Sequence, residues 1–157
     1  DTSGVVWVLG AYQSTGRSSL DDDARGVQAM LRAWDLGLGD VSIAIGDINS
    51  AGAAHRGISV NEYLGGVFAE LNGGRPPFTI RGAAKGPGSI DDRTIQLNHA
   101  FAGRKLMVHE SATGLLKSIK FWKGQNNRLK DPIDALGYVY AELAPLRPRR
   151  AKEMKIR

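Results

Sequence analysis

Two hydrophobic patterns alternate along this sequence. In the first, short runs of β-branched and aromatic residues are bounded by glycine or polar residues, which is typical of strands. In the second, apolar residues recur every three or four positions, as on one face of an amphipathic helix. The first pattern predicts strands over residues 4–12, 41–48, 78–83 and 105–109. The second predicts helices over residues 21–36, from Ser59 to the Gly73-Gly74 pair, from Ser89 to Phe101, over residues 111–122, and from Asp131 to about Ala144.

The order of these elements indicates the fold class. Strands and helices alternate from end to end, which favours an α/β fold with a mixed, mostly parallel central sheet and helices on both faces. The run 41–48 is apolar apart from Ser42 and Asp47, so we expect this strand to lie in the middle of the sheet, covered on both faces.

Polar residues mark where two of the helices begin. Ser59 and Glu62 have the spacing of a capping box. Asp131 fits an N-cap followed by Pro132 at the first helical position, where proline already has the required backbone angle.

Charge and composition narrow the possible functions. Residues 147–157 carry six Lys or Arg and one Glu, so the remaining 15 basic and 15 acidic residues balance. We therefore expect one domain over residues 1–146 and a basic tail over 147–157. There is no cysteine, so a metal site must use Asp, Glu or His, which favours hard cations. No apolar run is long enough for a membrane span and no signal peptide is evident, so we expect a soluble protein without a membrane partner.

Four carboxylates are candidate metal ligands. Asp47 follows a predicted buried strand, where it either binds a metal or accepts bonds from the N–H groups of the next loop. Asp131 and Asp134 share a helix face and could bind one metal together, although a helix cap explains both as well. Phosphodiester hydrolysis without a cysteine nucleophile favours two divalent cations held by three or four carboxylates, and Asp1 is the candidate for the third.

The last of these motifs resembles a known family. The stretch from Lys130 to Tyr138, KDPIDALGY, resembles the D-x-x-D-A-L-x-Y close of the nuclease domain of tailed-bacteriophage terminase large subunits. The strand that ends in Asp47 and the order of elements are also similar to that family. The resemblance implies an RNase H-like fold, related to RuvC-type resolvases, that cleaves double-stranded DNA with two Mg²⁺ or Mn²⁺ ions. It also implies that Asp47 and Asp134 are metal ligands and that Asp131 is accessory.

The family opens with a hydrophobic strand that ends in the first catalytic Asp. No such strand precedes Asp1. Asp1 therefore corresponds either to the first catalytic Asp of the family or to an acidic residue that comes later in the family's sequence. We expect residues upstream in a parent protein to form this strand and to pair with residues 4–12. The chain as given is then expected to be weakly active or inactive.

A run of basic residues precedes the last motif. Residues 111–130 contain no acidic residue and five basic ones: Lys117, Lys120, Lys123, Arg128 and Lys130. Their spacing suits contact with a phosphate backbone, and a solvated helix face explains them equally well.

Two functional hypotheses follow. The first is a DNA endonuclease domain that acts during viral genome packaging in the cytoplasm of the infected host cell. The second is a catalytically incomplete domain that binds DNA or docks on the packaging machinery. The resemblance implies double-stranded DNA as one partner, with the portal, the small terminase subunit and the ATPase domain of the same protein as others.

Overall fold

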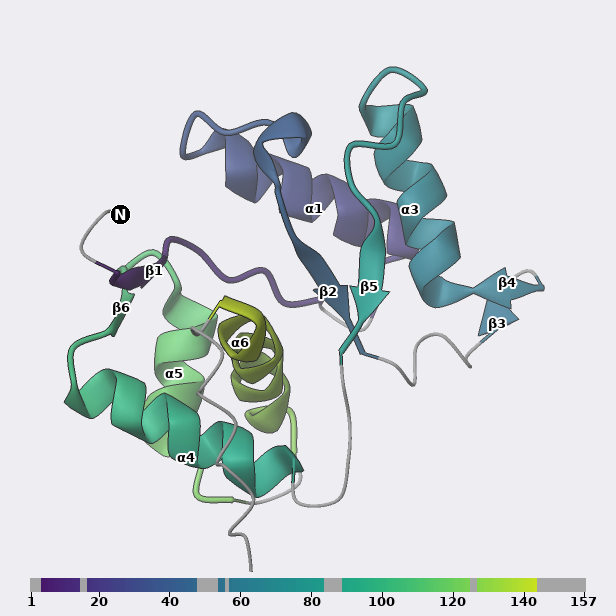
Figure 1. The fold of residues 1–157 in the computed structure, drawn as a ribbon. Coiled ribbons are helices and arrows are strands. Elements are labelled where there is room, and N and C mark those ends of the chain that lie inside the picture. Colours follow the sequence, from purple (N-terminus) through teal and green to yellow (C-terminus); the bar gives the residue numbers. More distant parts are fainter. Residues whose placement is uncertain are drawn as a thin grey trace, which may run out of the picture.

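The structure is a computed structural model that describes residues 4–14, 17–47, 54–55, 57–83, 89–124 and 127–143, without the side chains of 54–55 and 89–90. These residues form a mixed α/β structure with five α-helices and short strands (Figure 1). This confirms the predicted fold class at that level. Asp1 and the basic tail, 147–157, lie outside the described residues.

The predicted elements are present, and the strands are shorter than the apolar runs. The strands are β1 (Val6–Val8), β2 (Ala44–Gly46), β3 (Ala54–His55), β4 (Ile58–Ser59), β5 (Ile80–Gly82) and β6 (Leu106–Val108). The helices are α1 (Leu20–Arg32), α3 (Val60–Leu71), α4 (Ser89–Ala102), α5 (Thr113–Phe121) and α6 (Lys130–Leu143), with a 3₁₀ turn at Leu38–Asp40. The β3–β4 hairpin was not predicted.

The strands pair as separate two-stranded ladders in the described residues. β1 pairs in parallel with β6, and β2 pairs in parallel with β5, while β3 and β4 form the antiparallel hairpin. Within the described ranges β2 therefore has one ladder neighbour, and its expected position in the middle of a sheet is wrong.

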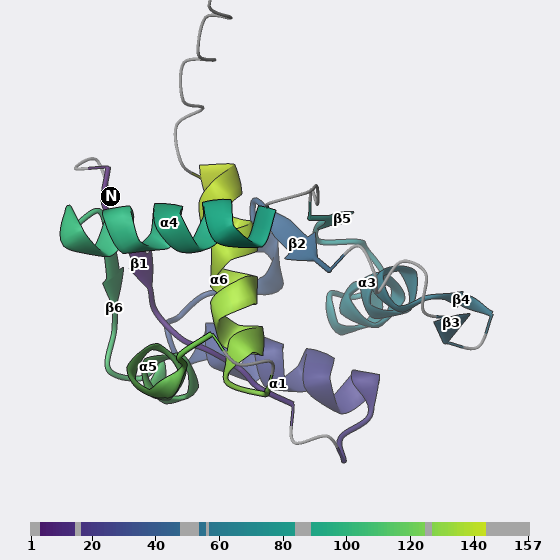
Figure 2. The ribbon, with the colours of Figure 1, turned by 90° about the horizontal axis from the view of Figure 1, so that it is seen from below.

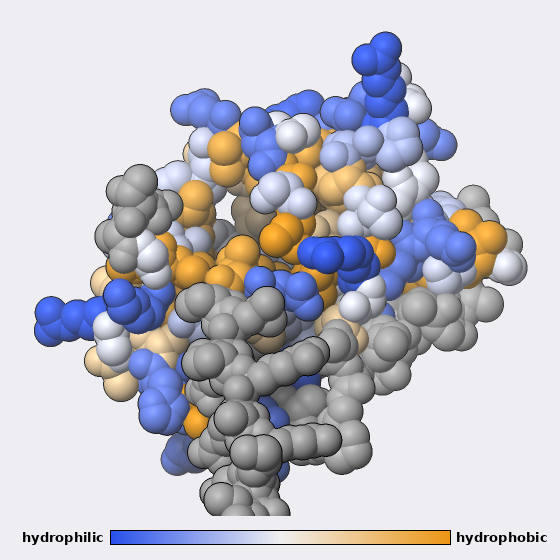
Figure 3. All heavy atoms as spheres, in the orientation of Figure 1, coloured by the Kyte–Doolittle hydropathy of each residue, from blue (hydrophilic) through white to orange (hydrophobic). Residues whose placement is uncertain are grey.

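Helices cover β2 in place of a second strand. Helix α6 packs against β2. On another side, Ala44 and Ile45 line an apolar cavity of about 310 Å³ together with Leu31 of α1 and Phe68 of α3. All three β2 residues stay half-buried. Figure 3 shows hydrophobic side chains gathered in the middle of this face of the molecule. Helix α6 thus covers one side of the apolar run, and an apolar cavity lies between the run and helices α1 and α3.

Two hydrophobic clusters form the core. The first joins α1 and α3 through the buried residues Ala24, Val67 and Phe68. The second joins α4 to β6 through Leu97, Ala100 and Leu106, with Ile133, Leu136 and Tyr140 of α6 packed against it. Figures 1 and 2 show α4 crossing α6, with α5 beside them. Helix α6 therefore contacts the second cluster as well as β2.

The serine caps determine where α1 and α3 begin. Ser59 accepts a hydrogen bond from the Glu62 N–H at 3.2 Å, and the Glu62 carboxylate accepts bonds from the Ser59 N–H and hydroxyl. Ser19 and Asp22 form the same reciprocal pair at the start of α1. The bonds from the Ser59 hydroxyl and N–H lower the pKa of Glu62.

The predicted cap of α6 is wrong by two residues. The helix begins at Lys130, so Asp131 lies in its first turn and is not the N-cap. Lys130 donates its N–H to the Asn127 carbonyl at 2.9 Å, and the Asn127 side chain accepts from the Leu129 N–H. A turn anchored by Asn127 thus starts the helix before the Asp131-Pro132 pair.

We expect Ser59→Ala to lower the free energy of unfolding by about 1 kcal/mol at neutral pH, because an N-cap acceptor is lost. The lowered pKa of Glu62 means that its contribution is present above the pKa of the unfolded chain and is lost as pH falls through the folded pKa. The difference between wild type and Ser59→Ala, measured by urea unfolding, should therefore become smaller as the pH falls below the ordinary pKa of a glutamate side chain. The part of the difference that comes from the backbone N–H of residue 62 should remain in a Glu62→Gln background, where the pH-dependent part should be absent. A difference that does not change at all with pH contradicts this account of the cap.

Candidate functional site

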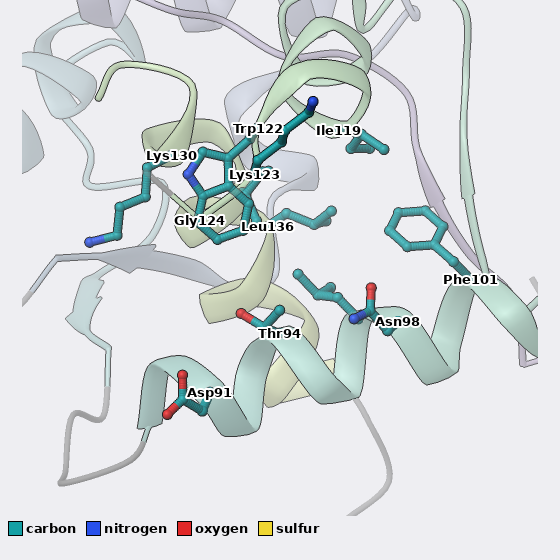
Figure 4. A pocket seen from close by; sticks show the side chains of 12 residues that line it. Asp91, Thr94, Asn98, Phe101, Ile119, Trp122, Lys123, Gly124, Lys130 and Leu136 are labelled. Carbon is teal, nitrogen blue, oxygen red and sulfur yellow. The ribbon is translucent and has the colours of Figure 1, made fainter. Parts of the chain in front are cut away.

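A cavity of about 640 Å³ lies between α4, α5 and α6. Its apolar wall includes Phe101 of α4 and Leu136 of α6, and Figure 4 shows Thr94 and Asn98 of α4 across the cavity from Trp122. Two basic residues, Lys123 and Lys130, also line it. An apolar and aromatic wall with cationic groups at its edge suits a ligand that carries both a ring and an anionic group.

Asp134 lies beside this cavity through its contact with Lys130. The Lys130 ammonium is 3.4 Å from Oδ2 of Asp134, one helical turn away, and the two side chains are 25% and 22% exposed. The ammonium occupies the position of a counter-ion for the carboxylate. Asp131 is exposed and lines a different cavity, together with Tyr12 and Arg128. Asp131 and Asp134 thus lie on the same helix but next to different cavities.

Asp47 is half-buried directly after β2. The neighbouring strand β5 is joined to the last turn of α6, where the Arg81 guanidinium lies 3.9 Å from the Glu142 carboxylate. Asp134 is eight residues earlier on α6, which corresponds to about 12 Å along a helix axis. Acidic groups are therefore spread along α6 rather than gathered at one end.

The predicted metal centre is not assembled by the residues that the structure describes. Among them, no group of three or more His, Asp or Glu is placed to hold a metal ion. Asp1, the predicted third ligand, lies outside them. The described carboxylates alone do not make a fitting site, so we derive no chemical step through a bound metal.

The basic run divides between two surfaces. Lys117 and Lys120 are exposed on α5, and the Lys120 ammonium lies 5.3 Å from the Phe121 ring centroid. Lys123 follows the end of α5 and lines the cavity with Lys130. Arg128 is exposed at the other cavity, beside Asp131. The structure therefore brings two of the five predicted basic residues to the cavity next to Asp134.

The sequence reading missed Arg93. It is 7% exposed, and its guanidinium carbon lies 4.6 Å from the centroid of the Tyr138 ring on α6. Arg93 is a charged residue next to the apolar positions of an amphipathic helix, and nothing in the local sequence indicated that it would be buried. The available signal was Gly137, a glycine in the middle of a predicted helix, which indicates close approach of another group.

Comparisons with protein-family models, with curated proteins and with solved structures found no match for this chain. The similarity to terminase nuclease domains therefore rests on the motif residues alone. None of the helices in the described ranges has the length and apolar character needed to cross a membrane.

We expect Lys117, Lys120 and Lys123, changed together to Ala, to weaken binding of duplex DNA equally for all sequences. If each lysine neutralises one phosphate, the slope of log K against log salt falls in magnitude by about 2.7. Fluorescence anisotropy over a salt series measures this slope. The matched control changes three exposed arginines, Arg25, Arg32 and Arg75, to Ala, which alters the net charge equally and should leave most of the slope intact. Equal losses in both variants would mean that only the overall charge matters.

Proposed function

We propose that this chain is an RNase H-like nuclease domain that cleaves double-stranded DNA with divalent metal ions during viral genome packaging. The observation that carries the proposal is the position of Asp134. This partly buried carboxylate pairs with Lys130, which lines an aromatic cavity together with Lys123. A carboxylate next to cationic groups suits a site where a phosphate backbone approaches a metal ligand. The KDPIDALGY motif, which contains Asp134, supports the same function.

The proposed roles follow from the chemistry of each residue. Asp47 and Asp134 would hold Mg²⁺ or Mn²⁺, with Asp131 accessory and Asp1 as the further ligand. Phosphodiester hydrolysis without a cysteine nucleophile favours divalent cations held by carboxylates, which is why these residues are proposed as ligands. Lys123 and Lys130 would hold the backbone near Asp134, since lysine binds phosphate as a point charge.

A second candidate function has an observation of its own. Helix α5 exposes Leu116, Ile119 and Phe121 beside its lysines. A helix face that is both apolar and basic is also suited to docking on a protein partner. The alternative is thus a module that binds DNA or docks on a portal or motor protein without cutting.

We expect Asp134→Ala to reduce Mn²⁺-dependent nicking of supercoiled plasmid by at least about a hundredfold, because loss of even an outer-shell group at metal sites costs 10- to 100-fold. Loss of the ion pair with Lys130 should change stability little, since a partly exposed pair of this kind contributes about 0.5 kcal/mol. Activity and melting temperature are measured on the same preparations.

Glu70→Ala is the matched control, because Glu70 is an exposed helix carboxylate on α3. It should nick as wild type does. A folded Asp134→Ala protein with undiminished cleavage would remove Asp134 from the site. DNA binding by a wild-type chain that never nicks with Mg²⁺ or Mn²⁺, even when it is extended upstream by about 15 residues to restore a first strand, would favour the second candidate.

A further inference from the structure

Arg93 is a buried cation at the crossing of α4 and α6. Its side chain is packed against Gly137 and lies over the face of the Tyr138 ring, 4.6 Å from the centroid. Only 7% of the residue is exposed. A guanidinium stacked on an aromatic ring is held in a defined plane and remains fully charged.

No anionic partner for Arg93 exists within the described ranges. The ion pairs found there join other residues, and the Arg93 Nε is fully buried without a hydrogen-bond acceptor. The adjacent carboxylates on α4, Asp91 and Asp92, are exposed and form no ion pair with it in this structure. Removing a charge from water without pairing it is strongly unfavourable, so a folded protein that keeps such a group has a use for it.

Gly137 makes room for this cation. A Cβ at Gly137 would lie 3.3 Å from Cδ and 3.6 Å from Nε of Arg93, which is closer than ordinary packing allows for Cδ. Glycine in a helix interior is less favourable than alanine by about 1 kcal/mol. The helix therefore carries an unfavourable residue at a position where a larger residue would press on Arg93.

We propose that Arg93 binds a phosphate group. The terminal nitrogens of Arg93 are not among the fully buried atoms without partners, and they are the donors that a phosphate would meet. A guanidinium can donate two parallel hydrogen bonds to phosphate oxygens, and its fixed plane lowers the ordering cost of doing so. Sequence recognition is not required, because such a contact positions the backbone.

The inference deepens the proposed function and rests on it for the source of the phosphate, which we take to be the DNA backbone. Tyr138 is four residues after Asp134 on α6, so Arg93 contacts the helix one turn beyond the proposed metal ligand. A phosphate held by Arg93 would lie on the helix that carries Asp134.

The test compares wild type with Arg93→Met, which keeps most of the side-chain volume and loses the charge, and with Arg93→Lys. Melting temperatures are measured with inorganic phosphate and with chloride at equal ionic strength, and binding of a short DNA duplex is measured by anisotropy. Arg75→Met is the control, because Arg75 is exposed.

Phosphate should raise the melting temperature of wild type and of Arg75→Met by clearly more than that of Arg93→Met, whose remaining rise measures the general stabilising effect of phosphate as a salt. Without phosphate, Arg93→Met should melt at or above the wild-type temperature, because an unpaired buried charge has been removed. Its DNA affinity should fall at least about tenfold, or about 1.4 kcal/mol, and Arg93→Lys should be intermediate because a point charge cannot form two parallel bonds.

Three other results are informative. If the phosphate effect on the melting temperature depends on Arg93 but DNA affinity is unchanged in Arg93→Met, the site binds free phosphate. This result supports phosphate binding by Arg93 and contradicts the DNA backbone as its source. If phosphate raises the melting temperature of Arg93→Met as much as that of wild type, and the two proteins bind DNA equally well, the inference is overturned. Arg93 is then a packing residue. If Arg93→Met binds phosphate and DNA as wild type does while Asp134→Ala still loses nicking, the inference about Arg93 fails and the proposed nuclease function stands. Failure of the inference can therefore be distinguished from failure of the proposed function.

Discussion

Arg93 lies between α4 and α6, where it contacts Gly137 and Tyr138 beside the apolar cluster that joins the two helices. Helix α6 also packs against α5 and β2, so its position affects both hydrophobic clusters and the β2–β5 ladder. Without a side chain at Gly137 the two helices can approach closely enough for Arg93 to lie between them.

Electrostatics around α6 follows from that arrangement. Lys130 neutralises Asp134 in the first turn, Arg93 adds a buried positive charge near the middle, and Arg81 pairs with Glu142 in the last turn. Asp134 therefore lies between the positive charge of Lys130 and that of Arg93, and a carboxylate flanked by two cations is suited to phosphate chemistry. The same cations lessen the repulsion that two or more carboxylates would have at this surface.

Much of the fold could be predicted because its signals are local. The reciprocal Ser59–Glu62 cap, the helical period through Leu97 and the strand at Leu106 depend on neighbours a few residues away, and each is confirmed. The position of β2 in a sheet could not be read in this way, because an apolar run does not say whether strands or helices cover it. The start of α6 was displaced because the Asn127 turn competes with the Asp131 cap.

The candidate site was harder to predict than the fold. Lys123 and Lys130 come to one cavity with Trp122, an arrangement that the sequence did not predict. Asp47 stays a prediction, because its neighbours depend on how β2 and α6 are placed in space. Arg93 carried no sequence signal of its own, since only the packing of α4 on α6 determines that it is buried.

A double-mutant cycle on Gly137→Ala and Arg93→Ala tests the central contact most directly. In wild type, alanine at position 137 gains helix propensity and loses packing against Arg93, whereas in the Arg93→Ala background only the gain remains. The account predicts that Gly137→Ala is more stabilising in that background by at least about 0.5 kcal/mol in the free energy of unfolding. Additive effects of the two substitutions would contradict it.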